Sequence, residues 1–176
     1  MACKFSTEQI RKTIEFHGHS CPGLAIGMRA AEYCLTSFPD ADPTALVCVT
    51  ETDMCGVDGI QYLTGCTFGK GNLIHRDYGK MAFSFFDRTT NEGFRLVFSY
   101  TTEGAGKEDM IKCVMETDLS ELFTRQELHS GAPRSARVLT GMICESCGER
   151  TMESRTRRYR GQTLCIPCFR QVDQKA

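Results

Sequence analysis

Four cysteines near the carboxyl terminus have the spacing of a metal site. Cys144 and Cys147 form one Cys-x-x-Cys pair, Cys165 and Cys168 form a second, and seventeen residues separate the pairs. Two such pairs allow four thiolates to meet one tetrahedral zinc ion. Because four thiolates leave no open coordination position, we expect this zinc to be structural rather than catalytic.

The residues around these pairs predict a small treble-clef-like finger over residues 136–176. Gly148 follows the first pair, where a tight knuckle needs a positive φ, and the polar stretch up to Gly161 favours a hairpin. Cys168 then opens a short helical segment that would carry the last ligand. The predicted order is therefore knuckle, hairpin and helix.

A second group of ligand types lies near the amino terminus. His17, His19 and Cys21 fall within five residues, and in an extended segment alternate side chains point to the same side. Cys21 also stands at the predicted start of a helix, where free amides and the helix dipole favour a thiolate that is either a ligand or a nucleophile. His17 has a structural interpretation as well, because it continues the apolar face of the first helix.

A polar cluster over residues 51–58 follows a predicted buried strand and could complete the same centre. We predict that Cys55 joins the site, with Asp53 as an alternative ligand. Asp53 and Asp58 could instead cap the next helix. The predicted core centre therefore contains His17, His19, Cys21 and Cys55, with the two thiols as candidate catalytic groups. Its metal would be zinc or another transition metal such as nickel or iron.

The glycine-rich stretch over residues 65–72 does not match a phosphate-binding loop. Only three residues separate Gly65 from Gly69, and Gly71 stands where a magnesium-binding Ser or Thr is needed. The stretch could bring Lys70 to an anion or simply connect two strands. Three other cysteines fall on apolar faces and are predicted to be small core residues: Cys34, Cys48 and Cys113.

The elements that would position these residues form an α+β pattern, in which helices pack on a mainly antiparallel sheet over residues 1–135. Ser6 and Gln9 predict a capping box at the first helix, and Pro22 suits the first turn of the second. Predicted strands span 45–51, 73–77, 81–86 and 94–100, the last two as a hairpin, and predicted helices span 22–35, 107–116 and 120–129. The breaks over residues 131–135 predict the domain linker.

Composition and charge limit the class of protein. The chain has 176 residues, eleven cysteines and a formal net charge of −1, and its first thirty residues contain no uninterrupted apolar run. We therefore expect a cytoplasmic protein with reduced thiols and no membrane segment. The finger carries a basic run with one tyrosine, and a solvated hairpin is favoured over a nucleic-acid surface: Arg155, Arg157, Arg158, Tyr159 and Arg160.

Three segments closely resemble the family of formylmethanofuran dehydrogenase E subunits: residues 16–23, 58–61 and 65–72. The resemblance spans nearly the whole chain and implies an α+β core, in some members with a carboxy-terminal treble-clef finger. It also implies a metal-associated pocket with His19, Cys21 and Cys55 as its first residues and His17 behind them, in a homodimer. The family name refers to a molybdenum- or tungsten-dependent enzyme of one-carbon units, which makes a metalloenzyme a candidate partner.

Three hypotheses about function follow from these features. In the first, the core metal binds or activates a small substrate, or serves an accompanying metalloenzyme. In the second, Cys21 is the nucleophile of a thiol enzyme or redox sensor, with Cys55 or Cys66 as its resolving partner. In the third, the finger is a recognition module for nucleic acid or protein.

Overall fold

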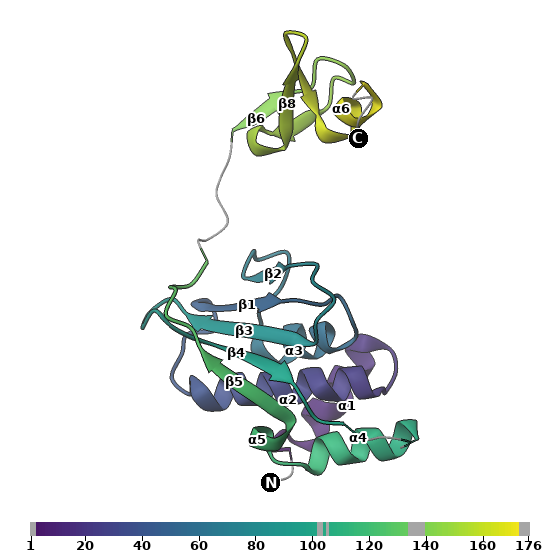
Figure 1. The fold of residues 1–176 in the computed structure, drawn as a ribbon, viewed down its shortest axis with the longest axis vertical. Helices are drawn as coiled ribbons and strands as arrows, with labels where there is room; N and C mark the ends of the chain where they lie inside the picture. Colours follow the sequence, from purple (N-terminus) through teal and green to yellow (C-terminus); the bar gives the residue numbers. More distant parts are fainter. Residues whose placement is uncertain (1–2, 102–103, 105, 134–139, 173–176) are drawn as a thin grey trace. The chain divides into compact units, whose positions relative to one another are not determined.

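The computed structural model describes residues 3–101, 104, 106–133 and 140–172. The chain divides into two compact units, Met1–Ala136 and Arg137–Ala176. The predicted boundary between residues 135 and 136 lies outside the described residues. We describe the core unit and the finger unit separately (Figure 1).

The core unit is built on a five-stranded sheet, as the sequence predicts. The strand order is β2-β1-β3-β4-β5, in which β1 pairs with β2 in parallel and every other pair is antiparallel (Figure 1). The predicted hairpin is confirmed as β3 and β4. The strand bounds are β1 Leu46–Thr50, β2 Leu73–His75, β3 Ala82–Asp87, β4 Glu92–Phe98 and β5 Phe123–Glu127.

One face of this sheet packs against helices. Phe83, Phe85, Phe94 and Leu96 are almost completely buried and form a single core cluster with apolar residues of helix α2. The other face of β1 buries Val47 and Val49 in a separate cluster. Both faces of β1 are therefore covered, which explains why that strand reads as a continuous apolar run.

Helix α1 (Thr7–His17) begins and ends at the residues that its sequence favours. The Ser6 hydroxyl accepts a hydrogen bond from the Gln9 amide, and the Gln9 side chain accepts one from the Ser6 amide, so the predicted capping box is confirmed. Gly18 ends the helix with φ of 92°. The segment after His17 is consequently a left-handed turn and not the extended strand that we expected, because glycine permits the helix to close there.

Helices α2 (Pro22–Ser37) and α3 (Gly56–Thr64) lie unusually close together. A Cβ atom added to Gly27 would overlap the carbonyl oxygen of Gly56, and one added to Gly23 would lie 3.3 Å from Cβ of Cys55. The small residues of α2 therefore permit close packing, as predicted. This contact brings the start of α3 against the first turns of α2.

The predicted helix over residues 120–129 is wrong. Helix α4 (Lys107–Glu116) is followed by a single turn, α5 (Leu119–Leu122), and the chain then pairs with the free edge of β4 as β5. Phe123 is buried, and the Arg125 guanidinium lies 4.3 Å from the ring centroid of Phe94. Backbone pairing and burial at the sheet edge outweigh the local helix pattern.

The finger unit consists of two hairpins and a helix. Strands β6 (Gly141–Ile143) and β7 (Arg150–Met152) form the first hairpin, and β8 (Thr156–Tyr159) and β9 (Gln162–Cys165) form the second. A 3₁₀ turn, Glu153–Arg155, joins them, and α6 (Ile166–Val172) ends the described part. None of the helices in the described residues of either unit is long and apolar enough to cross a membrane.

Candidate metal centres

The finger brings its four predicted ligands together. The sulfur atoms of Cys144, Cys147, Cys165 and Cys168 all lie within 4.8 Å of one another. Cys144 Sγ accepts a hydrogen bond from the Cys165 amide at 3.3 Å. Backbone amides, first that of Cys147 and then that of Cys165, lower the pKa of Cys144 to about 6. The backbone thus favours the thiolate, which is the form that binds zinc.

Local backbone contacts shape this cysteine cluster. The Cys144 carbonyl accepts from the Gly148 amide at 2.9 Å, and Gly148 has φ of 77°, as the predicted knuckle requires. Few apolar residues lie beneath the cluster, and they include Leu164 with Tyr159 and Phe169 packed against it. So small a core supplies little folding free energy without a metal ion.

The core unit assembles the second predicted ligand group from three places in the sequence. One ligand atom from each of His17, His19, Cys21 and Cys55 lies within 4.8 Å of all the others. His17 is the last residue of α1, Cys21 is the N-cap of α2, and Cys55 is the N-cap of α3. The two imidazole rings lie 4.5 Å apart between centroids, and His17 Nε2 lies 3.9 Å from Cys21 Sγ.

The two thiols of this group differ in their surroundings. Cys21 Sγ accepts a hydrogen bond from the Leu24 amide at 3.3 Å, as expected for an N-cap, and only 9% of Cys21 is exposed. Cys55 makes no side-chain cap, and burial, followed by the neighbouring Cys21, raises its pKa. Cys55 is therefore a protonated thiol at neutral pH in the metal-free protein, which disfavours it as an independent nucleophile.

Asp58 also belongs to this centre, although its position in the sequence suggests a helix cap. Its Oδ2 lies 2.7 Å from Nδ1 of His17, and the N-cap of α3 is Cys55. Asp58 lies three positions after Cys55 and therefore lies near it on the helix. That spacing is the available signal, although nothing in the sequence places α1 beside α3.

Comparison with known proteins agrees with this architecture. The family model described as "FmdE, Molybdenum formylmethanofuran dehydrogenase operon" matches residues 16–136, which is more than half of the chain. The chain belongs to the FmdE family. A second model, the prokaryotic dksA/traR C4-type zinc finger, matches residues 139–174. Together with the four clustered thiols, this match assigns zinc to the finger of this FmdE protein.

Two individual relatives extend the comparison. An FmdE-like protein of tungsten formylmethanofuran dehydrogenase, from Syntrophus aciditrophicus, has a crystal structure similar to this one, with a TM-score of 0.74, 22% identity and 98% of each chain covered. At that identity the likeness concerns the fold. A probable S-adenosyl-L-methionine-binding protein from Archaeoglobus fulgidus is 27% identical over 92% of this chain. The chain spans about half the length of that relative, 52%.

Several predicted candidates lie outside the ligand group of this FmdE core. Asp53 is exposed and does not join it. Cys66 is completely buried in the main core cluster, where burial raises its pKa, so the geometry does not suit it as a resolving partner for Cys21. Cys34 and Cys48 are buried as predicted, whereas Cys113 is half-buried.

The glycine-rich stretch of this FmdE core connects α3 to β2. The Asn72 side chain accepts from the Thr67 amide at 2.8 Å and donates to the Leu46 carbonyl at 3.0 Å. Lys70 is exposed. These contacts support the strand-connection interpretation over an anion site.

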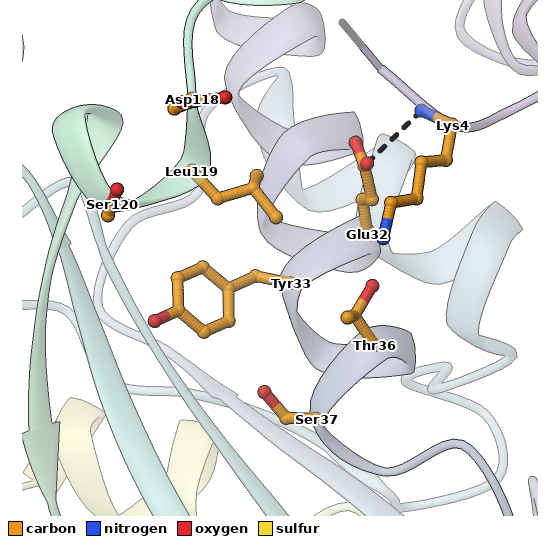
Figure 2. A pocket seen from close by; sticks show the side chains of 8 residues that line it. All are labelled: Lys4, Glu32, Tyr33, Thr36, Ser37, Asp118, Leu119 and Ser120. Atoms are coloured by element: carbon orange, nitrogen blue, oxygen red, sulfur yellow. Dashed lines mark hydrogen bonds between the residues drawn. The ribbon is translucent and has the colours of Figure 1, made fainter. Parts of the chain in front are cut away.

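A cavity of about 370 Å³ lies elsewhere on the FmdE core (Figure 2). It is lined from the second half of α2 and from α5, by residues that include Tyr33 and Leu119. The Glu32 carboxylate in it already accepts hydrogen bonds from the Lys4 amide and from Arg29. Since α2 rises about 1.5 Å per residue, this cavity lies on the order of 20 Å from Cys21. It is separate from the metal-ligand chemistry.

Proposed function

We propose that the core of this FmdE-family protein binds a transition metal through His17, His19, Cys21 and Cys55. The observation that carries the proposal is the convergence of these four ligand atoms within 4.8 Å from the ends of three different helices. Two imidazoles and two thiols suit zinc, and also nickel or iron. Four such groups are rarely gathered by chance.

The exposure of the ligands suggests how the centre would act. Cys21 is almost buried and the His17 side chain is 9% exposed, whereas His19 is exposed. If the exposed imidazole gives way to a substrate, three protein ligands remain, as in catalytic metal sites. The metal would then polarise a carbonyl group or lower the pKa of a bound water molecule. Cys21 and Cys55, proposed as the essential thiols, would hold the ion during this exchange.

The biological setting is proposed from the relatives. The family description refers to a molybdenum formylmethanofuran dehydrogenase operon, and the similar crystal structure is that of an FmdE-like protein of the tungsten enzyme. We therefore propose that the core centre either acts on a small substrate itself or serves a molybdenum or tungsten enzyme of one-carbon units. A homodimeric, cytoplasmic protein remains part of this proposal.

Elemental analysis of the purified protein tests the core site. We expect two metal equivalents per chain in the wild type and one in Cys21→Ser, because the finger keeps its zinc while the core loses a ligand. The matched control is Cys113→Ser, which changes a half-buried cysteine on α4 outside both ligand groups. Equal metal content in Cys21→Ser and the wild type, with both proteins folded, would show that the core site does not exist.

A further inference from the structure

We infer that Asp58 is a positioning residue that aims Nε2 of His17 at the core metal. The inference rests on the proposed function, because it concerns how one ligand of that same centre is held. It also assigns a role to Gln61 and to the loop that follows α3, neither of which the ligand set itself explains.

The imidazole of His17 is held by opposite edges. Nδ1 lies 2.7 Å from Asp58 Oδ2, and Nε2 lies 3.9 Å from Cys21 Sγ, on the side of the ligand group. When Nδ1 carries the proton and donates it to the carboxylate, Nε2 keeps its lone pair for a metal ion. Asp58 thereby selects both the tautomer and the orientation of the ring.

The carboxylate is itself fixed by a second hydrogen bond. Gln61 Nε2 donates to Asp58 Oδ1 at 3.3 Å, from the next turn of α3. The Gln61 side-chain oxygen in turn accepts from the Phe68 amide at 3.3 Å, in the connection after the helix. Both carboxylate oxygens therefore have partners, and the chain of contacts runs from the loop through Gln61 and Asp58 to His17.

Magnitudes separate a positioning role from an ordinary ion pair. The Asp58 side chain is 39% exposed, and an exposed ion pair contributes only about 0–1 kcal/mol to stability. Loss of a hydrogen-bonding partner behind a metal-bound histidine typically weakens metal affinity by about 10–100-fold. Substitution of Asp58 should thus affect metal binding strongly and the free energy of unfolding weakly.

The experiment measures zinc affinity at the core site by competition with a chromophoric chelator, in full-length protein whose finger is already loaded. We expect Asp58→Asn to weaken core binding by about 10–100-fold and Gln61→Leu by less. Asp53→Asn is the matched control, because it removes the same charge from an exposed position just before α3. Within the described residues Asp53 has no hydrogen-bond or ion-pair partner, so its substitution should leave the affinity unchanged.

A second readout reports the tautomer directly. In the zinc-loaded wild type, ¹H–¹⁵N long-range correlation spectra should show His17 protonated at Nδ1 and metal-bound at Nε2. In Asp58→Ala we expect this pattern to be lost or mixed with the other tautomer while the fold is retained. A merely structural carboxylate would not change the tautomer.

The outcomes distinguish this inference from the proposed function. If wild-type protein binds zinc only in the finger, the proposed core site fails, and the positioning role fails with it. If the core binds zinc and His17→Ala weakens binding, but Asp58→Asn matches Asp53→Asn, only the positioning role is overturned. Zinc bound through Nδ1 of His17 would overturn it as well.

Discussion

The two cysteine-containing centres of this protein are built in opposite ways. The finger collects four thiols from one short segment, and its chain has a very small apolar cluster beneath them. The core collects two imidazoles and two thiols from three helix ends that lie over a large aromatic and aliphatic core. The difference teaches that in the finger the metal holds the fold, whereas in the core the fold holds the metal site.

The largest expected effect comes from breaking the finger. Cys168→Ser should remove one zinc equivalent and unfold the finger, because zinc binding supplies roughly 10–16 kcal/mol of apparent folding free energy in such modules. Amide resonances of residues 140–172 should collapse to unfolded positions while those of the sheet remain. Loss of the sheet resonances in the same variant would contradict the independence of the two units.

The core centre should instead be sensitive to helix packing. Gly27→Ala forces α2 and α3 apart, because its Cβ would overlap the Gly56 carbonyl oxygen. We expect a loss of about 1–3 kcal/mol in the free energy of unfolding, measured in urea, together with loss of the core metal. Gly69→Ala is the control, since a Cβ there meets no atom within 4 Å. Retention of full core metal affinity in Gly27→Ala would show that the ligands do not depend on this contact.

The two core histidines should be unequal. His17→Ala should weaken core zinc binding by more than about 100-fold, beyond the usual effect of outer-shell changes, because His17 is shielded and oriented. His19→Ala should weaken it by about 10-fold or less, because water can take the place of an exposed ligand. Chelator competition on both variants checks the order, and a reversed order would refute the exchangeable role of His19.

The smallest expected effect concerns stability that the core has without any metal. Hydrogen bonds from Arg95, at 2.6 and 2.8 Å, lower the pKa of Glu51. Because the folded pKa lies below the unfolded value, this stabilisation is complete above about pH 4.5 and is lost as pH falls through the folded pKa. In chelator-treated protein, Glu51→Gln should cost roughly 1 kcal/mol near pH 7 and less in acid. An identical pH dependence in both proteins would contradict this assignment.

Much of the fold could be predicted from local sequence. The Ser6–Gln9 capping box, the start of α2 at Pro22 and the β3–β4 hairpin each depend on residues close together in the chain, and the structure contains all three. The residues of β5 predict a helix instead, because their strand state depends on the free edge of β4, a distant segment. Propensity over a few residues cannot register that edge.

The same division applies to the metal centres. The sequence by itself determined the finger, because four thiols at that spacing have one efficient arrangement around zinc. It also placed His17, His19 and Cys21 together. Only the tertiary structure brought Cys55 to them and Asp58 to His17, through the glycine contact between α2 and α3 and the packing of α1 beside α3. Helix-to-helix contacts depend on shape over the whole surface, and therefore no local pattern encodes them.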